Sequence, residues 1–235
     1  RTESWVASLN RDRTGFWEAV KGELESDAMP LKPQRVIAAV NKRLPEPAIV
    51  ISDAGTPTPY ASRFLRLNGQ GSSLVIPRAF GGLGYAIPAV VAAWLARPEA
   101  RPVGLFGDGS FGMAAGELET LGRLQVPAVL IHFNIACFGW IKALQRVHAR
   151  PGANEAFVSV DFNPGDMRRV AEAFGVTAFR AETPEELETA LDAAFAAKGP
   201  SFVDVAVESI GDVIPPVYRW LQKTGKDPLA LAAAE

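Results

Sequence analysis

The sequence predicts an α/β fold with a doubly wound, mainly parallel sheet and helices on both faces. Two observations support this prediction. Short apolar runs bounded by turn residues alternate with longer segments of helical periodicity, and such runs are typical of strands buried on both faces. Parallel neighbours need a crossover connection, which the intervening helices supply. With 235 residues and 48% hydrophobic content, the chain can bury one complete α/β core.

The elements can be placed in order along the chain. Residues 1–30 are polar and contain tryptophan, as expected for a linker and helix from a preceding domain. Pro30 and Pro33 mark the boundary, because proline is favoured at the first turn of a helix. The spacing then predicts strands over 102–106, 128–133 and 202–207, and helices over 34–44, 113–125, 166–174 and 184–197. Thr183 and Glu186 form a capping box before the last of these helices, and residues 211–235 are expected as a helical tail.

Composition excludes several classes of function. The net charge is −2 and no basic run is present, so nucleic acid is not an expected partner. The longest apolar stretch, over 87–95, is too short to span a bilayer, and no signal-like segment opens the chain. Cys137 is the one cysteine, which excludes an internal disulfide and fits a reducing compartment. We therefore expect a cytoplasmic location. Because the chain starts with Arg1, we also expect a processed or excised piece.

A glycine turn carries the clearest chemical signal. Gly107-Asp108-Gly109-Ser110 lies between a predicted strand and a predicted helix, and the next strand ends at Asn134. Neighbouring parallel strands present their carboxyl ends at one edge of the sheet, so Asp108 and Asn134 should lie close together. The glycines let backbone N–H groups approach a phosphate. A carboxylate beside a phosphate is repulsive unless a hard divalent cation such as Mg²⁺ lies between them. The turn therefore predicts a metal-bound diphosphate.

Two other interpretations of this turn remain open. Gly107, Gly109 and Gly112 match Gly-x-Gly-x-x-Gly after a strand, the pattern of an NAD-binding Rossmann module. That module needs an acidic residue about 20 positions further on, at the end of the next strand, where this chain has Phe133-Asn134-Ile135. The simplest alternative is a tight turn in which Asp108 only caps the helix.

Together with Asn134, the turn resembles the thiamine diphosphate motif of the acetolactate synthase, benzoylformate decarboxylase and pyruvate decarboxylase superfamily. Four further segments agree with this superfamily. Ala48 to Thr56 resembles the strand and turn that open its diphosphate-binding domain, and Gly81 to Ala89 resembles its Gly-rich segment. Phe138-Gly139-Trp140 resembles the aromatic-Gly that follows its asparagine pair, and Gly199-Pro200-Ser201 resembles the start of its last strand. The resemblance implies that residues 31–210 form a thiamine diphosphate-binding domain.

The resemblance also implies roles for individual residues. Asp108 corresponds to the metal-binding aspartate, and Cys137 corresponds to the residue whose backbone carbonyl completes the metal shell. Leu83 corresponds to the apolar residue that holds the cofactor in its bent shape. The implied cofactor-binding residues are Gly55, Thr56, Gly81, Leu83, Asp108, Gly109, Ser110, Asn134, Cys137 and Phe138.

One position departs from the superfamily pattern. The superfamily takes its second metal ligand from the second asparagine of a pair. Counting 27 positions from Asp108, or eight from Pro127, gives Ile135 in this chain. Its hydrocarbon side chain offers no oxygen to a hard cation. Three hypotheses follow: a weakened but working site, an inactive relative that kept the fold, and a substitution introduced into this copy.

By resemblance, the chain is expected to be part of a thiamine diphosphate-dependent decarboxylase, lyase or carboligase acting on 2-oxo acid or 2-hydroxyacyl-type substrates. The proton-relay glutamate of the superfamily is on a separate pyrimidine-binding domain, so no catalytic residue is assigned to this chain. A chain or domain carrying that half, in a homo- or hetero-oligomer, is an expected partner. The alternatives are a non-catalytic scaffold or regulatory relative, for which Ile135 is the evidence, and the NAD-binding module.

Other side chains are first given structural interpretations. His132 lies in a buried strand and is expected to be a satisfied core histidine. His148 could reach substrate, but a histidine at a helix end is also a favourable cap. Trp140 and Lys142 lie where the superfamily lines its substrate pocket, yet packing and solvation are their expected roles. Cys137 has no histidine or metal-spaced cysteine partner and is not expected to act as a nucleophile.

Overall fold

The structure, a computed structural model, describes residues 2–148, 157–163, 165–209, 216 and 217. Within them, six strands form one sheet in the order β2-β1-β3-β4-β6-β5, and every neighbouring pair is parallel. The strands are β1 (Ile49–Ser52), β2 (Ser73–Val75), β3 (Val103–Gly107), β4 (Val129–Asn134), β5 (Thr177–Ala181) and β6 (Ser201–Ala206). The doubly wound parallel fold predicted from the sequence is confirmed.

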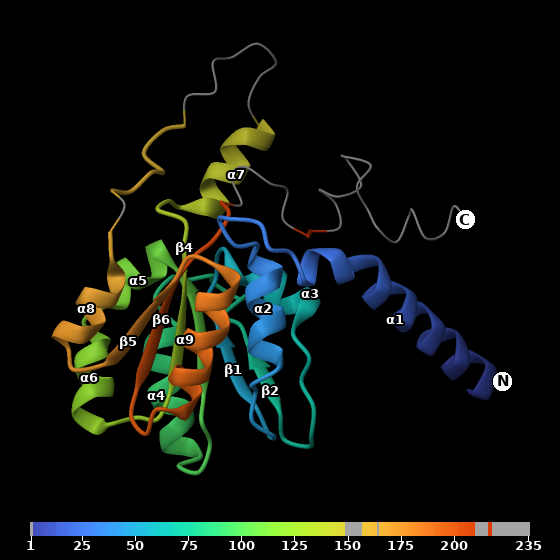
Figure 1. Cartoon of the computed structure of the whole chain (residues 1–235), viewed down its shortest axis with the longest axis horizontal. Helices are drawn as coiled ribbons and strands as arrows, with labels where there is room; N and C mark the ends of the chain where they lie inside the picture. The colour runs from blue at the N-terminus through green and yellow to red at the C-terminus, as the bar shows by residue number, and fades with distance from the viewer. Residues whose placement is uncertain (1, 149–156, 164, 210–215, 218–235) are drawn as a thin grey trace.

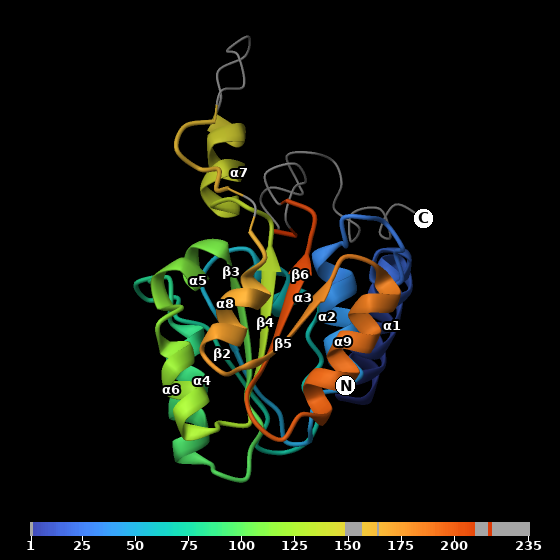
Figure 2. The same ribbon diagram turned by 60° about the vertical axis from the view of Figure 1, so that its left-hand side comes forward.

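Helices cover both faces of the sheet (Figures 1 and 2). One apolar core lies between the sheet and α1 (Thr2–Leu24), α2 (Pro33–Asn41), α3 (Pro57–Phe64) and α9 (Pro184–Ala196). The other lies between the sheet and α4 (Ala86–Ala96), α5 (Asp108–Ala114), α6 (Glu117–Leu124) and α8 (Met167–Ala173). The remaining described helix, α7 (Gly139–His148), projects beyond the carboxyl ends of the strands (Figure 2).

The four central strands, β1, β3, β4 and β6, are mostly apolar because both of their faces are covered. Each residue of β1 and β3 is buried, and alternate residues of β4 face opposite cores. Leu130 belongs to the core under α4 and α6, whereas Ile131 belongs to the core under α2 and α9. This two-sided burial is the reason that the strands appear in the sequence as continuous apolar runs instead of an alternating pattern.

One predicted helix is corrected by the structure. The segment expected as a single helix over 113–125 consists of the end of α5 and the whole of α6, and α5 begins at Asp108 itself. Met113, which contributed to the expected apolar face, is 65% exposed. Helix α6 ends because Gln125 adopts a left-handed backbone conformation with φ 50°. Pro127 lies beyond the end of the helix and does not itself end it.

The other expected elements agree with the structure to within a few residues. Helix α2 ends at Asn41, three residues before the expected position. The capping box is confirmed, because the Glu186 N–H donates to Thr183 Oγ1 and the Thr183 N–H donates to Glu186 Oε2, each at 3.2 Å. The tail expected over 211–235 lies outside the described residues apart from positions 216 and 217.

The order of the strands determines where a ligand can bind. The chain passes from β1 outward to β2 and then crosses back to β3 on the other side of β1. A crevice at the carboxyl ends of β1 and β3 is therefore expected, because connections leave these strands in opposite directions.

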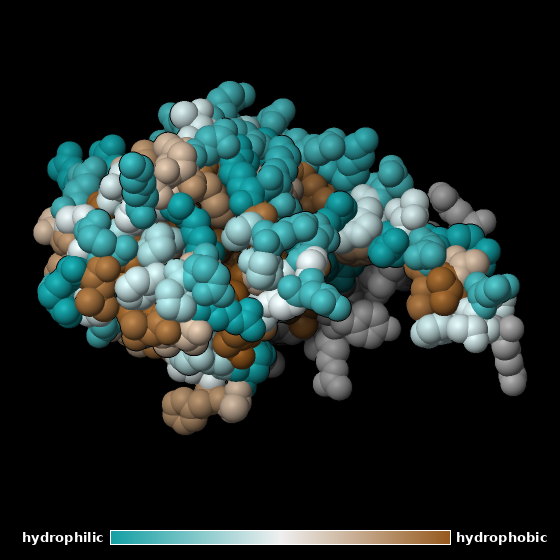
Figure 3. Space-filling model, turned by 90° about the horizontal axis from the view of Figure 1, so that it is seen from below, coloured by the Kyte–Doolittle hydropathy of each residue, from teal (hydrophilic) through white to brown (hydrophobic). Residues whose placement is uncertain are grey.

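Helix α1 extends away from the sheet (Figure 1), and it carries the exposed apolar side chains Trp5, Val6 and Leu9. Apolar surface is also visible on this projecting arm from below (Figure 3).

Candidate functional site

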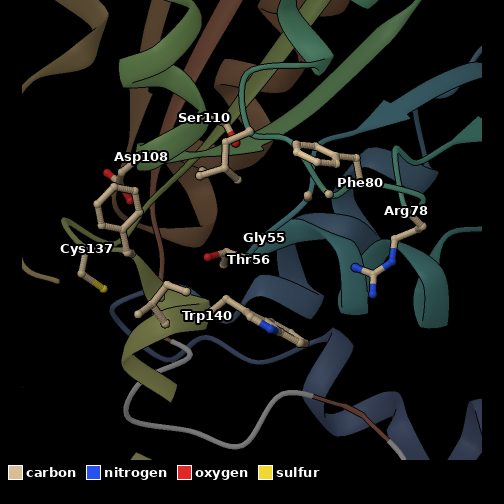
Figure 4. A pocket seen from close by; sticks show the side chains of 16 residues that line it. Gly55, Thr56, Arg78, Phe80, Asp108, Ser110, Cys137 and Trp140 are labelled. Carbon is tan, nitrogen blue, oxygen red and sulfur yellow. The ribbon is translucent and has the colours of Figure 1, made fainter. Parts of the chain in front are cut away.

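A cavity of about 430 Å³ opens at this switch point (Figure 4). Its walls come from the ends of β1 and β3, the loop before α4, and the segment that joins β4 to α7. The lining residues are Ala54, Gly55, Thr56, Arg78, Phe80, Gly81, Leu83, Gly107, Asp108, Gly109, Ser110, Cys137, Phe138, Gly139, Trp140 and Ile141. Nine of the ten predicted cofactor-binding residues are among them, and Asn134 is the exception.

The glycine turn forms one wall of the cavity. Gly107 ends β3 in extended conformation and Asp108 opens α5. A Cβ on Gly109 would lie 2.5 Å from a ring carbon of Phe138 and 3.3 Å from a methyl carbon of Leu83. A larger residue at position 109 would therefore displace two other cavity walls. The glycine allows the backbone of the turn to remain accessible within the cavity.

Asp108 is the acidic group of this wall. Its carboxylate Oδ2 accepts a hydrogen bond from the Ile135 N–H at 3.0 Å, and its Oδ1 lies 3.6 Å from His132 Nε2. Burial raises the pKa of Asp108 above its usual range, although the charge of His132 and the Ile135 N–H act in the opposite direction. A buried carboxylate is stabilised in its ionised form by a cation placed against it. Such a cation would have to approach from the cavity.

Ile135, which stands at the predicted position of the second metal ligand, has no side-chain donor. Ile135 packs against the apolar core that includes β4, and its backbone N–H is already used by Asp108. The described residues contain no group of three or more His, Cys, Asp or Glu side chains that could hold a metal. Mg²⁺, however, commonly binds through one or two carboxylates with phosphate oxygens and water. Asp108, the one carboxylate among the described residues that line this cavity, therefore fits a cation that a diphosphate helps to hold.

Leu83 lines the cavity between the turn after β1 and the glycine turn. One of its methyl carbons is 4.0 Å from the position that a Cβ on Gly55 would occupy, and the other is close to Gly109. Gly55 and Gly81 have φ values of 129° and 72°, which residues other than glycine rarely adopt. Thr56 is 4% exposed. The branched apolar side chain thus packs between Gly55 and Gly109.

Charged and aromatic side chains occupy the rest of the rim. Arg78 and Asp108 lie at opposite ends of the cavity, and Trp140 lies across from Ser110 (Figure 4). Phe80 is 99% exposed. Lys142, considered in the sequence as a solvated residue near the substrate, pairs with Asp161 at 2.9 Å. The side chain of His148 lies outside the described part of the chain.

A polar network behind Asp108 was missed by the sequence analysis. His132 is wholly buried as predicted, and its Nδ1 lies 2.9 Å from Asp204 Oδ1. Its Nε2, however, is buried without a hydrogen-bond partner and faces Asp108. Asn134 donates to the same Asp204 Oδ1 at 3.0 Å and to the Gly165 carbonyl at 3.3 Å. Asn134 therefore lines a second cavity, of about 350 Å³, on the far side of Asp108.

Asp204 joins several elements in this network. Arg180 Nη1 lies 2.6 Å from its Oδ2, and the Met167 N–H donates to the same oxygen at 3.3 Å. Burial would raise the pKa of Asp204, but the hydrogen bonds and charges of His132, Asn134 and Arg180 lower it overall. The sequence does contain a feature that indicates this network. Asp204 and His132 are titratable residues in the middle of apolar strands, and they pair in register across β4 and β6.

Cys137 is placed as a structural residue of the cavity wall. Its side chain is 3% exposed, and its Sγ lies 3.6 Å from Ser209 Oγ. Burial raises the pKa of the thiol above its usual value, which disfavours the nucleophilic thiolate. The Cys137 carbonyl accepts a hydrogen bond from the Gly139 N–H at 3.0 Å at the start of α7.

The fold and the cavity together define a diphosphate-binding α/β domain. The family described as "Thiamine pyrophosphate enzyme, C-terminal TPP binding domain" matches residues 53–205, and the chain belongs to this family. All ten of the predicted cofactor-binding residues lie within the matched segment. Family membership confirms the resemblance to thiamine diphosphate enzymes and favours it over the dinucleotide-binding alternative.

Individual relatives agree with this assignment. Benzoylformate decarboxylase of Pseudomonas aeruginosa is 33% identical over 192 residues, which cover 80% of this chain and 34% of that protein. Acetolactate synthase of Bacillus subtilis is 30% identical over 214 residues, which cover 88% of this chain and 36% of that protein. The solved structure of the thiamine diphosphate-dependent 4-hydroxybenzoylformate decarboxylase of Rhodococcus jostii RHA1 has a TM-score of 0.68 and 29% identity, over 78% of this chain and 34% of that one.

The chain therefore spans about a third of the length of these relatives. None of the helices in the described residues is both long and apolar enough to cross a membrane.

Proposed function

We propose that this chain is the diphosphate- and Mg²⁺-binding part of a thiamine diphosphate-dependent decarboxylase, lyase or carboligase. The observation that carries the proposal is the position of Asp108. Its carboxylate lies at the carboxyl end of β3, beside the turn over 135–137 and within a cavity at the switch point of the sheet. Open parallel sheets bind phosphate-bearing cofactors at this point. The names of the relatives support the three reaction types.

The proposed roles divide the cavity into two ends. At the Asp108 end, the Asp108 carboxylate and the Cys137 carbonyl would hold Mg²⁺, while the backbone of Gly109 and Ser110 would bind the diphosphate. At the centre, Leu83 would separate the two rings and keep the cofactor bent. When bound, thiamine diphosphate supplies an electron sink for the carbon that adds to the substrate carbonyl. The protein residues bind and orient it.

The substrate is proposed to be a 2-oxo acid or a 2-hydroxyacyl-type compound. Two relatives of the chain, a benzoylformate decarboxylase and a 2-hydroxyacyl-CoA lyase of Arabidopsis thaliana, support this proposal. Arg78 adds a positive charge at the cavity rim, opposite Asp108 (Figure 4). A guanidinium in this position can pair with a substrate carboxylate.

The remaining part of the active site is proposed to come from elsewhere. No catalytic residue is assigned to this chain, and the proton-relay glutamate is expected on a pyrimidine-binding domain of another chain or of another part of the same protein. We further propose that residues 1–30 connect to a preceding domain, that residues 31–210 form the cofactor-binding domain and that residues 211–235 form a tail. Leu31 pairs with Val207 just past the end of β6, and this contact between the two ends of the proposed domain supports its boundaries.

A second candidate function is favoured by one observation. Ile135 offers no side-chain ligand, so a scaffold or regulatory relative that kept the fold and lost the metal is a distinct hypothesis. Calorimetric titration of the complete, assembled protein with thiamine diphosphate in the presence of Mg²⁺ separates the two. The proposed enzyme gives saturable binding, and NAD under the same conditions gives none. Absence of thiamine diphosphate binding would support the scaffold and overturn the proposal.

A further inference from the structure

Asp53 is a buried carboxylate that links three walls of the cavity. It follows β1, it is 0% exposed, and its own N–H donates to the Leu105 carbonyl at 2.8 Å. Its Oδ1 accepts from the Ala54 N–H at 2.9 Å. No role for this residue was predicted from the sequence. Among the described residues it forms no ion pair, so its charge is stabilised by hydrogen bonds alone.

The other carboxylate oxygen reaches the loop that carries Leu83. Asp53 Oδ2 accepts hydrogen bonds from the Gly84 N–H and the Ala86 N–H, each at 3.1 Å. Burial raises the pKa of Asp53 overall, and Ser110 at the start of α5 is among the neighbours that act against this rise. One side chain therefore contacts the end of β1, the loop before α4 and the turn that contains Asp108.

The opposite side of this loop is also tightly packed. Gly84 has a φ of +85°, and a Cβ there would lie 3.2 Å from Met113 Cβ and 3.3 Å from Ala114 Cβ. The loop is thus enclosed between Asp53 on one side and α5 on the other. Leu83, the residue before Gly84, projects from it between Gly55 and Gly109. A shift of the Gly84 backbone would move Leu83 relative to both turns.

Burying a carboxylate without a cation costs free energy unless its hydrogen bonds are satisfied. An apolar side chain in its place would leave the backbone N–H groups of Ala54, Gly84 and Ala86 without this acceptor, so the carboxylate fixes the position of the loop. We propose that Asp53 is a positioning residue whose carboxylate sets the location of Leu83 relative to the Asp108 turn. The bend of the cofactor then depends on Asp53, although Asp53 does not touch the cavity. The inference rests on the proposed function and extends it.

The test compares two probes in the complete, assembled protein. Asp53→Asn replaces one accepting oxygen with an NH₂ group, so at least one of the backbone N–H groups loses its acceptor. We expect the affinity for thiamine diphosphate with Mg²⁺ to fall about 10- to 100-fold, the effect of one or two hydrogen bonds to a charged group. The affinity for inorganic pyrophosphate with Mg²⁺, which has no rings to bend, should change less than about threefold.

A double-mutant cycle shows whether Asp53 acts through Leu83. Leu83→Ala should give a similar ring-specific loss, and Asp53→Asn should add little in the Leu83→Ala background. Hydrogen exchange at the thiazolium carbon of saturating cofactor should slow in both single variants, since it requires the bent geometry. Ser201→Ala is the matched control, because Ser201 is equally buried at the opposite end of the sheet. It should change none of these quantities.

Three outcomes would overturn the inference while leaving the proposed function intact: wild-type affinity in Asp53→Asn, an equal loss for both probes, or full additivity with Leu83→Ala. If Asp53→Asn does not fold, Gly84→Ala disturbs the same loop from the other side and should give the ring-specific loss. Wild-type affinity in that variant would count against the inference. No binding of thiamine diphosphate by the wild-type protein would instead overturn the proposed function.

Discussion

At the scale of single residues, Ile135 has the largest proposed effect on the strength of the metal site. Its side chain packs against the core, so a Mg²⁺ ion bound as proposed would be left with Asp108, one backbone carbonyl, the diphosphate and water. Hard cations lose affinity when a protein oxygen is removed. The site as it exists should therefore hold Mg²⁺ more weakly than one with an amide ligand at this position.

The reversion Ile135→Asn tests this directly. We expect the affinity for Mg²⁺, measured by titration in the presence of thiamine diphosphate, to rise about 10- to 100-fold, the range seen when groups that ligate or orient a metal are changed. Ile135→Val is the matched control and should leave the affinity unchanged. Equal Mg²⁺ affinities in the wild-type, valine and asparagine proteins would show that position 135 does not face the metal.

A second prediction at this scale concerns the contribution of Asp204 to stability. It is 0% exposed and accepts hydrogen bonds from Asn134 and Met167 while pairing with His132 and Arg180. Asp204→Asn leaves at least one of these buried groups unsatisfied. The free energy of unfolding, measured by urea denaturation, should fall by about 1–3 kcal/mol. A loss below 0.5 kcal/mol, roughly the effect of an ordinary surface substitution, would contradict the network.

The functional residues that could be predicted from the sequence are those whose pattern lies within a short stretch of the chain. The glycine turn, Asp108 and the departure at Ile135 could all be predicted because turn chemistry and spacing are visible along the chain. Asp204 and His132 are visible in the sequence as titratable residues of apolar strands, but their roles and that of Asp53 could not be assigned. The partners that define these roles are 24 to 72 positions away and become neighbours only when the chain folds. Asn134 was predicted to bind the cofactor, and its amide instead bonds to Asp204 and the Gly165 carbonyl; its role toward the cofactor stays a prediction.

At the scale of elements, α2 and α9 are held together by an ionic cluster. Glu188 on α9 pairs with Arg35 and Arg43 of the α2 region at 2.8 and 2.7 Å and with Lys42 at 3.0 Å. Burial alone would raise the pKa of Glu188, but the hydrogen bonds from the three cations lower it from 4.5 to about 2. The cluster therefore favours folding only while Glu188 is ionised.

The sign of the pH dependence follows from this shift. Because the folded-state pKa is the lower one, the stabilisation is complete above about pH 4.5 and is lost as the pH falls toward 2. Since the Glu188 side chain is 27% exposed, we expect about 1–2 kcal/mol after solvent screening. Glu188→Gln should lower the free energy of unfolding by this amount at pH 7 and by less at pH 3. Asp192→Asn, which removes an exposed partner of Arg43, is the control and should have a smaller effect.

The helix and strand boundaries show where sequence periodicity is sufficient. The apolar strands and the capping box of α9 were predicted because each depends on residues within a few positions. The division of the 108–124 segment into α5 and α6 was not, because apolar spacing continues across the break and the exposed Met113 resembles a core position. The strand order decides which face of the sheet each helix covers. This order cannot be read from the apolar spacing within a single helix or strand.

At the scale of the whole molecule, the cavity is open at its rim. Exposed apolar side chains lie around it and next to it, including Phe80, Tyr85, Met113 and Ile141. A separate apolar group, Trp5, Val6 and Leu9, lies on the projecting helix α1 (Figures 1 and 3). Clustered apolar side chains at a surface are typical of contacts with another domain or chain. They agree with the proposal that the pyrimidine-binding half covers the cavity.

This arrangement predicts that activity needs both halves. A protein limited to residues 1–235 should give no detectable turnover of a 2-oxo acid such as benzoylformate, and addition of a pyrimidine-binding half from the same complete protein should restore it. Replacing Phe80 with Ser should weaken that complementation without changing the thermal stability of this chain, because Phe80 is 99% exposed. Full turnover by residues 1–235 alone would contradict the divided site.

The central claim is that Asp108 binds a cation that in turn holds thiamine diphosphate. The most direct measurement is the affinity of the complete protein for thiamine diphosphate with Mg²⁺ and with a chelator, in wild type and in Asp108→Asn. We expect Mg²⁺ to improve the wild-type affinity by at least about 10-fold and to have little effect on the variant. Binding that is unchanged by the chelator, or an equal Mg²⁺ effect in Asp108→Asn, would contradict the claim.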